Sequence, residues 1–84
     1  MQNKSIVYNK NAFEGDKVIK NNLLKIRLSL GYKFAKDFAE FLEISPNQYG
    51  RYESNTVQPS SEVLLKICKK LDKPIWEILY EEEL

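Results

Sequence analysis

Residues 44–53 read ISPNQYGRYE, and this stretch carries the start signals of a short helix. Ser45 is a good N-cap, because its side-chain oxygen can accept a hydrogen bond from a free N–H of the first turn. Pro46 suits the first helical position, where its missing N–H would have no partner in any case. Gln48 follows Ser45 by three residues, which is the spacing of a capping box. The start of a helix over residues 46–53 is therefore well specified.

The outer side of this helix is unusually polar. Its helical spacing turns three apolar or aromatic residues inward: Ile44, Tyr49 and Tyr52. The outward positions then hold Asn47, Gln48, Gly50 and Arg51. Glycine costs about 1 kcal/mol relative to alanine in a helix interior. Gly50 therefore either lets another molecule approach the backbone or only avoids a clash.

Two helical segments are expected before this stretch. With Asp16 as N-cap, the first carries an amphipathic stripe at i, i+4, i+7 and i+11, and Gly31 stops it. The residues of this stripe are Ile19, Leu23, Ile26 and Leu30. The second segment carries Phe34, Phe38 and Leu42 on one stripe, with Ala35 and Ala39 beside it. Only Glu43 and Ile44 separate Leu42 from Ser45, so the turn into the helix over 46–53 must be very tight.

Two further helices are expected after it. Residues 54–60, SNTVQPS, form a loop by composition. Ser60 then caps a fourth helix, whose apolar stripe consists of Leu64, Ile67, Cys68 and Leu71. Pro74 opens a last short helix containing Ile75, Ile78 and Leu79. Trp76, in the same segment, either covers the core or contacts a second subunit.

Length and composition indicate one soluble globular domain. The chain has 84 residues, of which 43% are hydrophobic and 30% charged. No apolar run approaches the roughly 20 residues that cross a membrane, and the N-terminus does not resemble a signal peptide. A single cysteine, Cys68, cannot form an internal disulfide, which agrees with a reducing compartment. We therefore expect a cytoplasmic protein that does not associate with a membrane.

Charge is unevenly distributed along the chain. Residues 1–52 hold nine Lys/Arg and five Asp/Glu, which gives +4, whereas residues 53–84 hold four and seven, which gives −3. The last acidic run is EEE at 81–83. This pattern is either ordinary solvated surface with an acidic tail or a positive face kept apart from a negative end, as phosphate binding requires.

Catalysis is a poor interpretation of this sequence. There is no histidine, and Cys68 lies on an apolar stripe with no base in a plausible motif. No cluster has metal-ligand spacing, and there is no glycine-rich phosphate loop. We expect neither enzymatic activity nor a cofactor or metal.

A helix, a tight turn and a short capped helix with an outward polar row form the layout of a helix-turn-helix. The second helix of such a pair enters the major groove of DNA with its N-terminal end toward the base edges. Asn and Gln pair well with adenine, and Arg pairs with the two acceptors of guanine. The outward row of residues 46–53 is therefore expected to contact double-stranded DNA.

The chain resembles the Cro and phage-repressor family of helix-turn-helix domains. The resemblance spans residues 23–79 and rests on Arg27 before LSLGY, on KDFAEFLEISPNQYGRYE, and on QPSSEVLLKICKKLDKPIWEIL. It implies an all-α, five-helix, lambda-repressor-like domain over residues 16–84. Residues 1–15 precede it as an arm or short strand, with IVY at 6–8 as the β-prone part. Arg27 and Glu53 fall where the family has a partly buried ion pair.

DNA contacts are expected from the third helix and its flanks. The candidate residues are Lys33, Lys36, Ser45, Pro46, Asn47, Gln48, Gly50, Arg51, Asn55 and Thr56.

The sequence departs from the family pattern in three places. Glu43 stands where the tight turn usually has glycine, so either the turn holds a non-glycine residue in a strained left-handed conformation or its geometry differs. Ala35 replaces a DNA-binding Gln, and one extra residue lies between Gly31 and Phe38.

The expected function is a sequence-specific transcriptional regulator of bacterial or phage type, most simply a repressor. A single small domain gives little contact area, so a homodimer on a palindrome is expected. Unused apolar residues at the two ends, among them Trp76 and Tyr80, favour pairing between subunits. Alternatively, residues 1–15 track phosphates through Lys4 and Lys10. Two other functions stay open: an antitoxin that pairs with a toxin, and a protein-interaction module without DNA binding.

Overall fold

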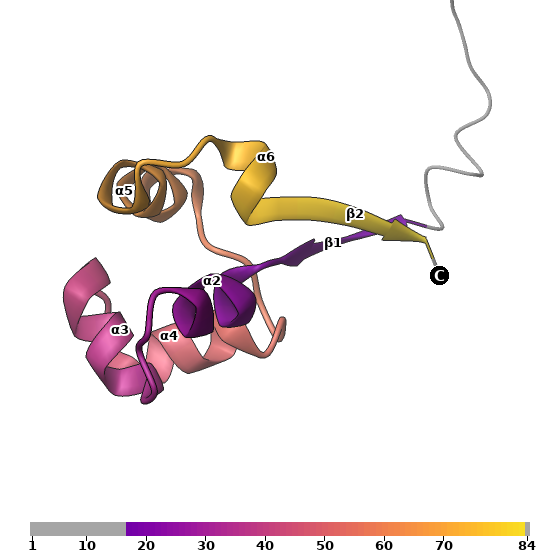
Figure 1. The fold of residues 1–84 in the computed structure, drawn as a ribbon. Coiled ribbons are helices and arrows are strands. Elements are labelled where there is room, and N and C mark those ends of the chain that lie inside the picture. Colours follow the sequence, from indigo (N-terminus) through magenta and orange to yellow (C-terminus); the bar gives the residue numbers. More distant parts are fainter. Residues whose placement is uncertain (1–16, 84) are drawn as a thin grey trace, which may run out of the picture.

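The computed structural model describes residues 17–83, which form five helices and two strands (Figure 1). In chain order these are β1 (Lys17–Asn21), α2 (Leu23–Ser29), α3 (Ala35–Leu42), α4 (Pro46–Glu53), α5 (Ser61–Leu71), α6 (Ile75–Ile78) and β2 (Leu79–Glu83). The expected arm over residues 1–15 and the expected N-cap Asp16 lie outside the described residues. None of the helices in the described part is long and apolar enough to cross a membrane.

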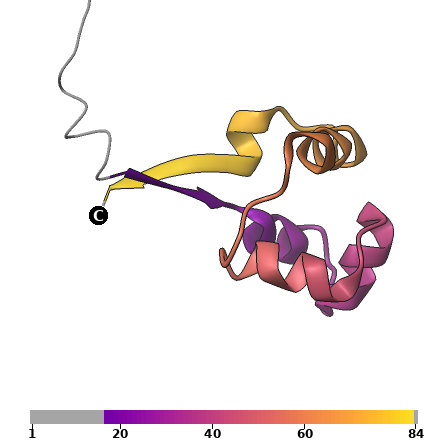
Figure 2. The same cartoon turned by 180° about the vertical axis from the view of Figure 1, so that it is seen from behind.

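The prediction of an all-α fold is wrong in one respect, because the two ends of the described chain form a small sheet. β1 and β2 pair antiparallel, with Lys17 opposite Glu83 at one end and Asn21 opposite Leu79 at the other. The resulting two-stranded ribbon extends away from the helices (Figures 1 and 2). The molecule is therefore elongated, at 47 × 24 × 22 Å.

The first helix begins later than predicted. Residues 17–21 form a strand, and α2 starts only at Leu23. Ile19 and Leu30, expected on the buried stripe, are 46% and 50% exposed. The segment KVIKN is too short to distinguish a helical period from a strand, and its β-branched Val18 and Ile19 favour the extended form once β2 lies beside it.

The C-terminal segment also differs from its prediction. α6 ends at Ile78, and Leu79 begins β2 instead of continuing the helix. Strand pairing places the acidic run beside the lysines of β1. The Nζ atoms of Lys17 and Lys20 lie 3.9 Å from carboxylate oxygens of Glu81 and Glu82, respectively. Glu81 and Glu82 of the acidic run thus form ion pairs within the chain, with the lysines of β1.

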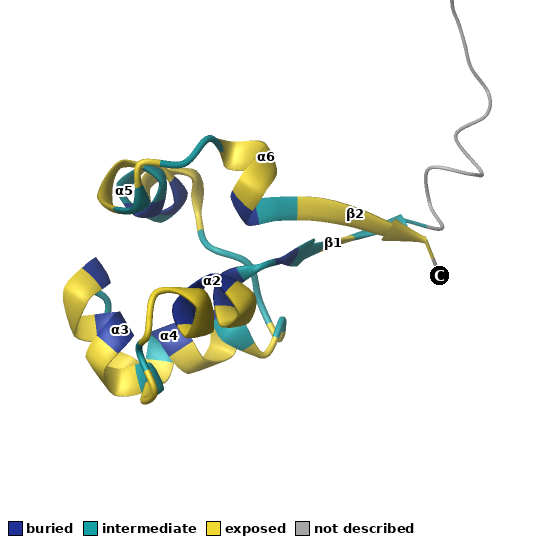
Figure 3. Ribbon diagram, in the orientation of Figure 1, coloured by how far each residue is buried: buried dark blue, intermediate teal, exposed yellow. Residues whose placement is uncertain are grey.

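All five helices contribute to one core between them (Figure 3). Its buried residues are Leu23, Ile26, Phe38, Ala39, Leu42, Tyr49, Tyr52, Leu64, Ile67 and Ile78. Cys68 is partly buried and packs against this core, which agrees with its predicted structural role. Phe34 was predicted to share the stripe of Phe38, but it caps α3 in an extended conformation and is exposed.

The predicted bounds of α4 and the predicted start of α5 are confirmed. The hydroxyl oxygens of Ser45 and Ser60 accept hydrogen bonds from the N–H groups of Gln48 and Val63, at 3.2 and 3.3 Å. Gly31 has a φ of 89°, so it takes the left-handed conformation that separates α2 from the approach to α3. These short-range signals fix the start of α4, the helix on which the predicted contacts depend.

Candidate nucleic-acid interface

α4 presents two different faces. Tyr49 and Tyr52 are buried against the core, whereas Asn47, Gly50 and Arg51 are exposed on the opposite side (Figure 3). No charge stands on the outer face apart from the guanidinium of Arg51. This face therefore offers amide and guanidinium donors together with an amide acceptor, which is the chemistry that reads base edges.

Most of the other predicted contact residues are also exposed near α4. These are Lys33 before α3, Lys36 in its first turn, Ser45 and Pro46 at the start of α4, and Thr56 beyond its end. A shallow groove separates α3 from the start of α4, with Lys36 and Pro46 on its walls. Acidic Asp37 and Glu40 line the same groove, so its positive charge is partly offset.

Two predicted contact residues, Gln48 and Asn55, are partly buried. Gln48 is half-buried at the edge of the inner face, and the cap at Ser45 uses its backbone N–H. Asn55 has a φ of 63°, and its side-chain oxygen accepts hydrogen bonds from the N–H of Asn21 at 2.9 Å and from Nε2 of Gln58 at 2.8 Å. The structure thus gives Asn55 partners inside the fold.

An ion pair fastens the C-terminal end of α4 to α2. Nε of Arg27 lies 2.7 Å from Oε2 of Glu53, and the side chains are only 10% and 16% exposed. Nη1 of Arg27 donates to the carbonyl oxygens of Tyr32 and Lys33 at 2.9 and 2.7 Å, so the guanidinium also holds the approach to α3. This arrangement connects the two helices of the motif through α2.

The buried phenol of Tyr49 completes this cluster. Its hydroxyl donates to Oε2 of Glu53 at 2.6 Å. The hydrogen bond to Glu53 raises the pKa of Arg27, and burial followed by the bond to Glu53 raises the pKa of Tyr49. Both groups therefore keep their protons at neutral pH and remain donors to the carboxylate.

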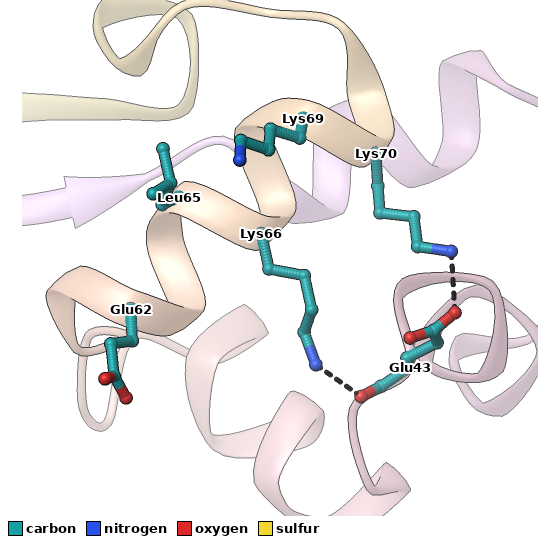
Figure 4. Close-up of a pocket in the computed structure, with 6 residues that line it drawn as sticks. All are labelled: Glu43, Glu62, Leu65, Lys66, Lys69 and Lys70. Atoms are coloured by element: carbon teal, nitrogen blue, oxygen red, sulfur yellow. Dashed lines mark hydrogen bonds and ion pairs between the residues drawn. The ribbon is translucent and has the colours of Figure 1, made fainter.

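The tight turn before α4 is held from α5. Of the two geometries left open for this turn, Glu43 takes the left-handed one, with φ 61° and ψ 44°. Nζ of Lys66 donates to the Glu43 carbonyl oxygen at 2.8 Å, and Nζ of Lys70 donates to Oε2 of Glu43, also at 2.8 Å (Figure 4). These bonds hold the turn in the left-handed conformation that its non-glycine residue disfavours.

The sequence did not identify every residue that positions α4. Lys66 and Lys70 lie off the apolar stripe predicted for the fourth helix, and nothing in their spacing indicated Glu43 as a partner. Asn21 and Gln58 were missed as well. The one available signal was the polar Asn21, two residues before the apolar start of α2 at Leu23, at a position where the helical prediction gave it no role.

The helical part of the fold matches a known family of helix-turn-helix domains. The model of the helix-turn-helix family HTH_3, of the Cro/C1 type, matches residues 23–77, from the start of α2 into α6. The chain belongs to this family. A search of curated proteins found no match.

Membership in the Cro/C1-type helix-turn-helix family identifies the chain as a DNA-binding regulatory domain. α3 and α4 supply the two helices of the motif, with the turn at Glu43 between them. Both strands lie outside the matched range. Across residues 17–83, no three His, Cys, Asp or Glu side chains gather as a metal site would require.

Proposed function

We propose that the protein is a sequence-specific transcriptional repressor that reads the major groove with α4. The observation that carries this proposal is the exposed polar row of Asn47 and Arg51 on a helix whose opposite face is buried. Arg51 can donate two hydrogen bonds to a guanine, and Asn47 can pair with an adenine. In this proposal the domain represses transcription by occupying its operator.

Phosphate contacts surround this row in the proposed complex. The free N–H groups at the start of α4 favour a phosphate, because they also lie at the positive end of the helix dipole. Lys33 and Lys36 are exposed on the approach to α3 and in its first turn, and Lys36 shares a groove with Pro46 at the start of α4. These residues supply affinity and register, whereas the row on α4 supplies sequence discrimination.

Replacement of Arg51 tests the reading role of α4. A duplex selected by the wild-type protein from a random pool serves as specific probe, and a random duplex serves as non-specific probe. Arg51→Ala should weaken binding to the selected duplex by about 1–3 kcal/mol and relax preference at one base position. Lys69→Ala, which removes an exposed cation on α5, is the matched control and should leave selected-site binding unchanged. Equal affinity of folded Arg51→Ala and wild type for the selected duplex would refute the assignment.

Gly50 offers a second test that separates stability from binding. A Cβ added at Gly50 would meet nothing within 4 Å, so the fold itself does not require glycine there. Gly50→Ala should therefore stabilise the free protein by up to about 1 kcal/mol. If the backbone of α4 lies close to DNA, the same change should weaken duplex binding. A variant that gains both stability and affinity would show that DNA does not approach this position.

A homodimer on a palindromic operator completes the proposal. Three large apolar side chains are exposed on α5 and α6: Leu65, Ile75 and Trp76, the last with 74% exposure. A second copy packed on this face would place two α4 helices on one side of the DNA, about one helical turn or ~34 Å apart. The same face would serve the toxin in the antitoxin alternative.

Sedimentation of the full chain, with and without its selected duplex, tests the dimer. A two-to-one complex on a palindromic site is expected, and Trp76→Ala should shift it toward monomer. A chain that stays monomeric on that site would overturn the dimer. Loss of affinity on deletion of residues 1–15, with no change in oligomeric state, would favour the phosphate-tracking arm instead.

A further inference from the structure

The ribbon and the end of α4 meet at a buried amide. Asn21, the last residue of β1, is only 6% exposed. Its Nδ2 donates to the carbonyl oxygen of Tyr52 and to Oε1 of Gln58, both at 2.7 Å. Its Oδ1 accepts from the N–H of Leu23 at 3.0 Å. Both side-chain hydrogens and the oxygen are thus used, each toward a different segment.

Gln58 and Asn55 extend this contact into a network. Nε2 of Gln58 donates to the carbonyl oxygen of Ile19 at 3.2 Å and to Oδ1 of Asn55 at 2.8 Å. The backbone N–H of Asn21 donates to the same Asn55 oxygen at 2.9 Å. Asn21, Asn55 and Gln58, called here the amide network, therefore join β1 to the loop that follows α4.

The amide network acts on a part of α4 that needs outside partners. The last carbonyl groups of a helix receive no hydrogen bond from an N–H group of the same helix, and the Tyr52 carbonyl is one of them. Asn21 satisfies this carbonyl from β1, and the left-handed Asn55 also donates its N–H to it at 2.9 Å. The N–H of Thr56, a residue in the predicted DNA-facing set, donates to the Arg51 carbonyl oxygen at 2.9 Å. The position of Thr56 and the end of α4 thus depend on the same turn.

We propose that Asn21 and Gln58 are positioning residues for DNA reading: they hold the C-terminal end of α4 and the loop after it in the register that base recognition requires. This inference rests on the proposed function, because the register has consequences only if α4 reads DNA. Neither residue needs to touch DNA. Because the phosphate-binding charges lie elsewhere, loosening the amide network removes sequence discrimination and leaves the electrostatic attraction to DNA in place.

The ribbon acquires a role from this arrangement. Its strands lie outside the helix-turn-helix match, and in isolation a two-stranded ribbon is marginally stable. Here its inner end is tied to α4 through Asn21, and to α6 through Asn22, whose N–H donates to the Ile78 carbonyl oxygen at 2.8 Å. The paired strands β1 and β2 therefore support the C-terminal end of α4 on its core side.

The test compares three variants on the selected and random duplexes. Gln58→Ala removes the bridge but leaves the bonds of Asn21 to Tyr52 and Leu23, so it should remain folded. It should weaken binding to the selected duplex about tenfold, the loss expected when one good base contact is misaligned. Affinity for the random duplex, and its dependence on salt, should not change. Asn21→Ala should show a larger loss of the same kind.

Asn22→Ala is the matched control, at the residue between β1 and α2. The Asn22 side chain donates to the Glu77 carbonyl oxygen at 3.2 Å, on the side of α6, and does not belong to the amide network. The affinity of Asn22→Ala for the selected duplex should equal that of the wild type.

Hydrogen exchange gives an independent readout: in Gln58→Ala the amides of Thr56 and Val57 should exchange faster, with the amides of α5 unchanged.

Each outcome decides the inference. Unchanged discrimination in folded Gln58→Ala would overturn it, as would an equal loss of affinity for both duplexes. An equal loss of discrimination in Asn22→Ala would also overturn it, since the effect would then not be specific to the amide network. If Asn21→Ala unfolds, Gln58→Ala decides alone. A wild-type protein that binds no duplex refutes the proposed function, and the inference falls with it, whereas intact discrimination in every variant refutes positioning alone.

Discussion

The two ends of α4 are flanked by the same unusual backbone conformation, stabilised in opposite ways. Glu43, before the helix, has a φ of 61°, and Asn55, after it, has a φ of 63°. At Glu43 the turn is held by lysine ammonium groups from α5, in contact with solvent (Figure 4). At Asn55 it is held by neutral amides packed between β1 and the loop.

This difference has physical consequences for the two turns. Asparagine tolerates the left-handed region better than glutamate, because its short side chain can hydrogen-bond locally. Charge pairs in contact with solvent contribute little and are screened by salt. Buried amides respond weakly to salt, but a missing partner leaves a desolvated donor or acceptor unpaired. The contacts at the start of α4 therefore contribute little free energy and weaken with salt. At its end, the loss of one amide leaves a buried partner unpaired and costs more.

The largest effect is expected at the ion pair on the C-terminal end. Glu53→Gln leaves the guanidinium of Arg27 mostly buried without its carboxylate, which should cost about 3 kcal/mol of stability. The melting temperature measures this loss, with the exposed Glu62→Gln as a control that removes the same charge. An unchanged melting temperature for Glu53→Gln would mean that the pair does not hold this end.

Matched alanine substitutions compare the two left-handed turns directly. Asn55→Ala removes the acceptor of two hydrogen bonds and places a less tolerant residue in the same conformation, at a cost of about 2 kcal/mol. Glu43→Ala removes only the Lys70 contact of the side chain and should lower the melting temperature less. Glycine at each position separates backbone from side chain: Glu43→Gly relieves the turn, whereas Asn55→Gly still loses the bonds. The reverse order of the two alanine variants would invalidate the comparison.

The smallest effect is expected from pH and salt at Glu43. The hydrogen bond from Lys70, followed by its charge, lowers the pKa of Glu43 below its ordinary value of 4.5. A carboxylate with a lowered pKa in the folded state stabilises the fold above its ordinary pKa, and this contribution disappears as pH falls through the lower folded value. Lys70→Met should therefore melt below the wild type at neutral pH, and the difference should shrink in acid and at high salt. Lys69→Met is the control, and a difference independent of pH would exclude the charge pair as its cause.

The sequence determined the helix-turn-helix itself, because its signals are local. Ser45, Pro46 and the position of Gln48 specified the start of α4 within four residues, and Gly31 and Ser60 marked two other boundaries. Alternation of Tyr49 and Tyr52 with polar neighbours separated the buried face from the exposed one. Caps, glycine conformations and helical periodicity depend on residues one or two turns apart, so they can be identified without knowledge of the rest of the fold.

Tertiary structure alone decided the ribbon and the two supports of α4. Residues 17–21 matched a helical stripe in the sequence, and only pairing with a segment some sixty residues later made them a strand. The same pairing turned Asn21 inward, where it meets Tyr52 and Gln58, and packing of α5 brought Lys70 to Glu43. These contacts join positions far apart in the chain, and a short segment such as KVIKN has no strong preference until its neighbour in space selects one.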